Sequence, residues 1–196
     1  VANLATTTLA TSGAAVIGGT LTAGAAGTTS SVAGVNILFE ANSIFIGDDV
    51  SGTTDTAANS VAFGIDALDA VTTGDANVAL GKSTLSGNTT GGNNIAIGNQ
   101  ALNAPDTEGS NLAIGSNALG GAIAGGEFNV AIGNSSGTDL TSADHTAMVG
   151  YEAGANVTEG SGSTFMGYQA GFNTNTGQDN VYMGKTAGRG NTTGGR

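Results

Sequence analysis

A five-residue block of alternating apolar positions recurs along most of the chain and ends each time in glycine. Residues 77–81 read NVALG, residues 94–98 read NIAIG and residues 111–115 read NLAIG. The glycines that end the block are Gly47, Gly64, Gly81, Gly98, Gly115, Gly133, Gly150, Gly167 and Gly184. Successive members lie 17 residues apart, except for one step of 18 between Gly115 and Gly133. So strict a period indicates a repeat architecture in which each unit packs on its neighbours.

Each block predicts one short β-strand. The residue before the glycine is apolar in every copy, and in most copies so is the residue two positions earlier, which places both on one side of an extended chain. The residue between them faces the other side and is alanine in five consecutive copies, from Ala62 to Ala131. Glycine permits the sharp turn that ends the strand. The repeat therefore predicts an all-β fold, a parallel β-solenoid or β-roll of nine 17-residue coils stacked about 4.8 Å apart.

The large strand residues, Ile97 and Ile114 among them, are expected inside the coil. A coil then buries two bulky side chains and some alanine, which is little to offset the conformational entropy of an ordered repeat. We therefore expect several chains to share a core around one axis, in a homotrimeric fibre. The alanine side of the strand, for example Ala96, would be the side where neighbouring chains approach closely.

Asparagine recurs four or five positions before the glycine of the block. These residues are Asn42, Asn59, Asn77, Asn93, Asn94, Asn111, Asn129 and Asn180. Stacked in register, the amides are expected to form ladders that pair with backbone groups of the turns.

The repeat also divides the chain into two regions. Residues 42–196 are the expected solenoid region. Residues 1–41 lack the block, and their alternation of Leu, Thr and Ala with glycine predicts a β-rich stalk, or a cap over the open edge of the solenoid. Gly194 precedes position 201 as Gly91 precedes Gly98, so the chain is expected to stop within a tenth coil and to be a fragment of a longer protein.

The side-chain pattern changes from about residue 133 onward. Between the two apolar strand positions, Met148, Phe165 and Tyr182 replace the alanine of the earlier coils. Four residues after the aligned glycine the change is opposite, from leucine, as at Leu102, to glycine, as at Gly171. Bulk thus moves from one side of the coil to the other. We expect Phe165 and Tyr182 to be buried against another segment or chain, because exposed they would leave an apolar stripe on the rod.

The composition excludes several classes of protein and of binding partner. Glycine supplies 35 of 196 residues, cysteine is absent, and 15 acidic against 4 basic residues give a net charge of −11. There is therefore no disulfide framework and no thiolate metal site. A chain this acidic repels phosphate backbones, so no nucleic-acid partner is expected. No apolar run approaches the length that membrane insertion requires.

Two known groups resemble this pattern. The strand sequence Asn-x-Val/Ile-Ala-Ile-Gly is similar to head repeats of trimeric autotransporter adhesins, which form trimeric left-handed β-rolls. Residues 93–102 (NNIAIGNQAL) and 165–171 (FMGYQAG) resemble more closely the repeats of bacteriophage tail-fibre proteins, and residues 20–24 (TLTAG) resemble repeats upstream in such fibres. The second resemblance implies a structural tail-fibre segment on the virion, with other tail proteins and a host receptor, such as a glycan, as partners. The alternative is the extracellular head of a bacterial adhesin.

Candidate chemistry is sparse, and we expect no enzymatic activity, cofactor or metal. His145 is the only histidine and lies where other coils carry Asn or Ser, so an exposed turn residue is expected. Asp48, Asp49, Asp66 and Asp69 could offer oxygen ligands to calcium. The nonapeptides of calcium-binding β-rolls are absent, however, and a solvated acidic edge is the preferred interpretation.

Two tyrosines are the candidate binding residues. Tyr151 and Tyr168 directly follow the aligned glycine in adjacent coils, and Lys185 follows it in the next. Stacked, exposed tyrosines could contact the sugar rings of a host glycan. The alternative is a ladder of rings that stabilises one coil on the next.

Overall fold

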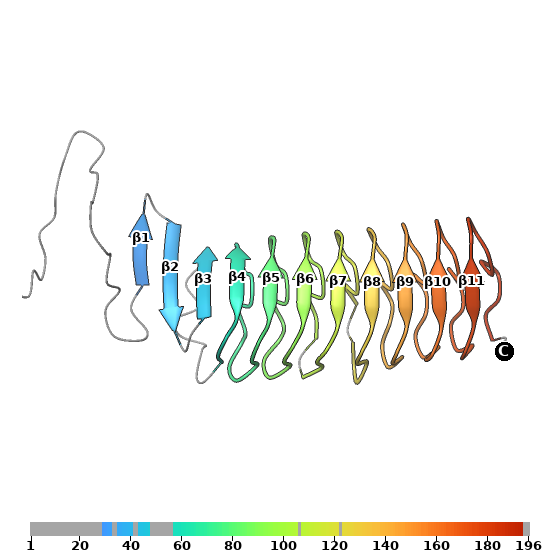
Figure 1. The fold of residues 1–196 in the computed structure, drawn as a ribbon, viewed down its shortest axis with the longest axis horizontal. Helices are drawn as coiled ribbons and strands as arrows, with labels where there is room; N and C mark the ends of the chain where they lie inside the picture. The colour runs from blue at the N-terminus through green and yellow to red at the C-terminus, as the bar shows by residue number, and fades with distance from the viewer. Residues whose placement is uncertain are drawn as a thin grey trace, which may run out of the picture.

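The computed structural model describes residues 29–32, 35–40, 43–47, 57–105, 107–121 and 123–193. They form one eleven-stranded sheet in which the strands follow the order of the sequence (Figure 1). The strands are β1 (Thr29–Val32), β2 (Val35–Glu40), β3 (Ser43–Gly47), β4 (Val61–Gly64), β5 (Val78–Leu80), β6 (Ile95–Ile97), β7 (Leu112–Ile114), β8 (Val130–Ile132), β9 (Ala147–Val149), β10 (Thr164–Met166) and β11 (Val181–Met183).

Strands β3 to β11 confirm the predicted parallel β-solenoid. Each strand pairs in parallel with the equivalent strand of the next coil, for example Ile95 with Leu112 and Leu112 with Val130. Backbone groups outside the strands continue the same coil-to-coil pairing, as in the bond from the Gln100 N–H to the Lys82 carbonyl at 2.9 Å. The nine strands span about eight turns of 17 residues, and each strand runs across the long axis of the rod (Figure 1).

An antiparallel hairpin precedes the solenoid. β1 pairs with β2, and β2 pairs antiparallel with β3, so backbone groups on the free edge of the first parallel strand are occupied. The hairpin belongs to residues 1–41, for which a β-rich stalk or cap was predicted, and residues 1–28 of that region lie outside the described residues. So do residues 194–196, the last of the expected incomplete tenth coil.

The interior of the coil is lined by the alanines and not by the large strand residues. Ala96 and Ala113 are fully buried, whereas Ile95 is 40% exposed and Ile97 and Ile114 are only half-buried. The expectation that Ile97 and Ile114 lie inside was therefore wrong. The expectation that the alanine side faces a neighbouring chain was wrong as well. In the coils of β4 to β7 the returning segment carries a leucine that fills most of the interior, so only a small strand side chain fits beside it.

The leucines that face these alanines share an unusual backbone conformation. Leu68, Leu85, Leu102 and Leu119 are fully buried and have φ between 47° and 55°. A left-handed conformation costs a leucine about 1–2 kcal/mol. Each leucine nevertheless occurs there, because the conformation aims its side chain at the alanine of the strand.

The predicted transfer of bulk is confirmed, and it takes place within one chain. Phe165 is fully buried, and a Cβ built on Gly171 would lie 2.3 Å from the Phe165 ring. The ring thus fills the volume that leucine fills in earlier coils. Met148 occupies the same volume over Gly154. Tyr182, in the last described strand, is partly buried and stacks on Phe165 with ring centroids 5.6 Å apart.

The step of 18 residues adds its extra residue outside the strands. Leu119 and Ile123 are both buried interior residues and are separated by residues 120–122. In the preceding coil only residues 103 and 104 separate the equivalent Leu102 and Pro105. The turn absorbs the insertion, and the strand register is unchanged.

The predicted amide ladder is present and buried. It consists of Asn77, Asn94, Asn111 and Asn129, and the backbone N–H of each of the last three donates to the side-chain oxygen of the asparagine one coil earlier, as from Asn94 to Asn77 (2.9 Å) and from Asn111 to Asn94 (3.0 Å). Asn77 and Asn180 donate instead to the hydroxyls of Ser60 and Ser163. Asn59 and Asn93 lie one position before the ladder, and Asn42 lies outside the described residues. The side-chain amides of Asn77, Asn94, Asn111 and Asn129 also donate to turn carbonyls, as from Asn94 to Glu108 at 2.8 Å. The ladder satisfies polar groups at a turn that is closed to water.

Candidate functional site

The outer face of the parallel sheet is a continuous apolar surface. Two side chains of each strand, three and one positions before the aligned glycine, point away from the coil. They are Ile44, Ile46, Val61, Phe63, Val78, Leu80, Ile95, Ile97, Leu112, Ile114, Val130, Ile132, Ala147, Val149, Thr164, Met166, Val181 and Met183. Only Thr164 is polar, and none is charged. Phe63 is 58% exposed and Met166 is 43% exposed.

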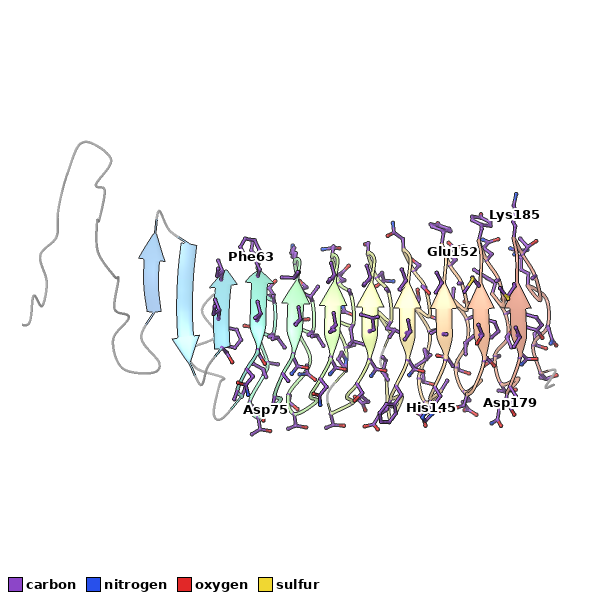
Figure 2. All side chains as sticks on the ribbon, viewed as in Figure 1. Phe63, Asp75, His145, Glu152, Asp179 and Lys185 are labelled. Carbon is purple, nitrogen blue, oxygen red and sulfur yellow. The ribbon has the colours of Figure 1, made fainter. Side chains whose placement is uncertain are left out.

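This face is unusual for a surface open to water. Nine strands spaced about 4.8 Å apart make it roughly 40 Å long. Soluble monomers rarely expose a continuous apolar patch of more than a few hundred Å², and larger patches mark contacts with other molecules. Charged residues lie beside the face and not on it: Figure 2 shows Glu152 and Lys185 at the ends of the strands and Asp75 and Asp179 at the turns before them.

A ladder of rings lies at the strand-end edge of this face. Tyr151 and Tyr168 are stacked, with centroids 5.5 Å apart and planes 8° from parallel, and they are 48% and 45% exposed. Lys185 continues the column, with Nζ 5.8 Å from the centroid of Tyr168. The structure thus confirms a ladder between coils, and glycan contact by the two tyrosines stays a prediction.

Polar groups border the tyrosines. The Gln169 amide donates to the Glu152 carboxylate at 2.6 Å across the coil boundary. A hydrogen bond with Glu152, and then the negative charge of that carboxylate, raise the pKa of Tyr151 above its ordinary value of 10.0. Tyr151 therefore stays protonated throughout the neutral range and presents a hydroxyl.

The opposite edge carries the only histidine. His145 is an exposed turn residue, as expected, with φ of 57°. Its ring stacks on the exposed Phe128 of the previous coil, with centroids 5.1 Å apart. The neighbouring acidic residue Asp144 accepts a hydrogen bond from the Glu127 N–H at 2.8 Å, so this edge is held by contacts between coils.

The residues considered for calcium are not brought together in the described part of the chain. Asp66 and Asp69 lie on one turn, where Asp66 accepts a weak hydrogen bond from the Ser83 hydroxyl at 3.4 Å. Asp48 and Asp49 lie outside the described residues. Among the residues described, no group of three metal-ligating side chains and no ligand-sized cavity is found. The same residues include no helix long and apolar enough to cross a membrane.

Comparison of the chain with protein-family models, with curated proteins and with solved structures finds no match. The fold and its surfaces are therefore the basis for any functional proposal. Sequence analysis identified the two outer columns but assigned them to the interior. The signal that could have placed them is the run of strand alanines from Ala62 to Ala113, because a thin coil whose returning segment also carries leucine has room for only a small strand residue on its inner side.

Proposed function

We propose that this chain is a structural fibre segment that self-associates, as a homotrimer, through the outer face of its sheet. The continuous, uncharged apolar face along nine strands is the observation that carries the proposal. A second copy suits this face because it has the same residue spacing and the same rise per coil, so that apolar side chains meet at every coil. A partner of another periodicity would match a few coils only.

The energetics favour such an assembly. Completing the burial of a half-exposed apolar side chain is worth about 1 kcal/mol. Each of the nine strands contributes two outer positions, and the sum is large enough to offset the roughly 4–15 kcal/mol that association costs in lost motion. The net charge of −11 per chain opposes association. Its effect is limited because the charges lie outside the apolar face and are screened at physiological salt.

The fibre is proposed to belong to a bacteriophage tail and to take part in attachment to the host. This step rests on the resemblance of residues 93–102 and 165–171 to tail-fibre repeats. Stacked coils with buried amide ladders suit the mechanical role, because each coil is fixed to the next by backbone and side-chain bonds. Such a rod would sit on the virion, contact other tail proteins and hold a receptor-directed part away from the particle.

The second candidate is the head of a bacterial surface adhesin. The strand sequence at residues 94–98 favours it, and the same apolar face would serve a trimeric head. The two candidates differ in where the chain is found, on the virion or on the bacterial surface.

Immunogold electron microscopy distinguishes the two. Antibodies raised against the purified chain should decorate the tail fibres of virions, and antibody absorbed with the same chain should not. Decoration of the bacterial surface in cultures free of phage would support the adhesin. If the antibodies label neither the virions nor the bacterial surface, both proposals are wrong.

A further inference from the structure

The outer face of the sheet changes in the same coils in which the interior changes. From β5 to β8 the strand begins with a bulky residue, such as Val78 or Val130, and a polar residue follows the aligned glycine, such as Asn99 or Asn134. In the coil of β9 the order of sizes is reversed: the strand begins with the small residue Ala147, and Tyr151 follows the glycine. The coil of β10 begins with Thr164, which has the shape of valine but is polar, and Tyr168 follows its glycine. The coil of β9 therefore has a notch at one edge of the face, and both coils have a projection at the other.

Rotational symmetry brings these two edges together. The strands run across the long axis of the rod (Figure 1), and Figure 2 shows Glu152 and Lys185 at the strand ends and His145 at the opposite edge. When copies are arranged around an axis parallel to the rod with their sheets facing inward, the strand end of one copy meets the strand start of its neighbour. The same coil of each copy lies at the same height. The projection of one copy thus lies beside the notch of the next.

We propose that Tyr151 packs into the notch at Ala147 of a neighbouring copy and that Tyr168 packs against Thr164 in the next coil. The inference rests on the self-association proposed above and identifies its contact in the C-terminal coils. The partner is a second copy because the notch and the projection occur in the same coil, so that each copy supplies what its neighbour lacks. In the coils of β5 to β8 the bulky strand start of one copy instead meets the polar residue that follows the glycine of its neighbour.

The geometry of the rings favours sideways packing over stacking with a sugar. Tyr151 covers one face of the Tyr168 ring, and Lys185 lies over that ring from the next coil. Tyr168 therefore has a neighbour within the chain on each side of its ring, which leaves less of either ring face for a sugar to stack on. The ring edges and hydroxyls stay exposed, and these are the parts that a neighbouring strand can contact. The Glu152 carboxylate is bound to Gln169, so the charge beside the rings has a partner within the chain.

A pair of introduced cysteines tests the contact. The chain contains no cysteine, so the variant Ala147→Cys/Tyr151→Cys carries the only thiols. Within one chain these positions are separated by roughly 13 Å of extended backbone, and a disulfide requires Cα atoms less than about 7 Å apart. Oxidation can therefore join them only between copies. We expect covalent trimers on a non-reducing gel. Either single variant alone should stay uncross-linked, and a co-refolded mixture of the two singles should give dimers.

The outcomes separate this inference from the proposed fibre. If the reduced double variant has the mass of a trimer by light scattering but oxidation yields no cross-link, the tyrosine contact is wrong and the fibre proposal stands. Binding of wild-type trimers to a glycan array that Tyr151→Ser abolishes, together with no cross-link, would assign the rings to a receptor instead. If the wild-type chain is a monomer, both proposals fail. A reduced double variant that keeps its circular dichroism but falls to monomers supports the contact, because both replaced side chains lie outside the coil.

Discussion

Exchanging the large and small residues of one C-terminal coil tests how the interior is packed. Phe165 fills the space above Gly171, as leucine fills the space beside alanine in the earlier coils. The double variant Phe165→Ala/Gly171→Leu would rebuild this coil with the residues of the coil that contains Ala96 and Leu102. The backbone already permits it, since φ is 61° at Gly171 and 47° at Leu102.

The magnitudes follow from the contacts of the two side chains. Phe165→Ala alone removes a fully buried ring and should cost about 3–5 kcal/mol of the free energy of unfolding. Gly171→Leu alone forces a side chain into the Phe165 ring and should cost about 2–5 kcal/mol, from overpacking and left-handed strain together. The double variant keeps only the leucine strain, about 1–2 kcal/mol, and the lost stacking with Tyr182, about 1 kcal/mol. We therefore expect it to lose about 2–3 kcal/mol, less than Phe165→Ala alone.

Urea unfolding followed by circular dichroism, at one fixed protein concentration, measures these differences. Hydrogen exchange at the amides of residues 164–171 shows whether the loss is local to the coil. The mirror exchange Ala96→Phe/Leu102→Gly is the matched control and should likewise be milder than Ala96→Phe alone. If the double variant is as unstable as the sum of its two single variants, strand and returning segment do not share one volume and the packing argument is refuted.

Three further predictions concern the ladder and the two sides of the strand. Asn94→Ala removes an acceptor and a donor from buried backbone groups and should lower the free energy of unfolding by about 2–4 kcal/mol. The exposed control Asn99→Ala should change it by less than about 0.5 kcal/mol. Equal losses for the two variants in urea unfolding would exclude a stabilising ladder. Ile97→Ser/Ile114→Ser should keep the β-sheet circular dichroism but weaken self-association at least tenfold in sedimentation, and unchanged association would exclude the outer face as the interface. Ala96→Leu should instead reduce the thermal midpoint of the folded chain by overpacking the coil, and an unchanged midpoint would show that this side of the strand has free space.

The coil length, the strand positions and the register could all be predicted from the sequence, because the aligned glycine repeats and each coil contains one apolar alternation. Which face of the strand points into the coil could not be predicted from the sequence. Alternation separates Ile95 and Ile97 from Ala96 but does not say which side is inside, and the usual preference for large buried residues gave the wrong answer. The decisive information lies in the returning segment, where Leu102 takes a left-handed conformation that few sequence rules would assign to leucine.

The C-terminal coils show which kind of sequence evidence is reliable here. The paired replacement of alanine by Phe165 and of leucine by Gly171 predicted correctly that Phe165 is buried against another segment, because opposite changes in size at two positions indicate that their packing is linked whichever side is inside. Among the tyrosines, the stacking of Tyr151 on Tyr168 followed from the register alone. What the rings contact beyond the chain depends on symmetry between copies, which one sequence does not contain.

The mass of the native chain in solution tests the central claim most directly. Light scattering on the purified 196-residue chain, at physiological salt, reports it without a label or a substitution. The account predicts three times the chain mass of 18.7 kDa, because the outer face of each sheet is covered by neighbouring copies. A folded species of 18.7 kDa that persists at high protein concentration would contradict it, since the apolar face would then be stable in water.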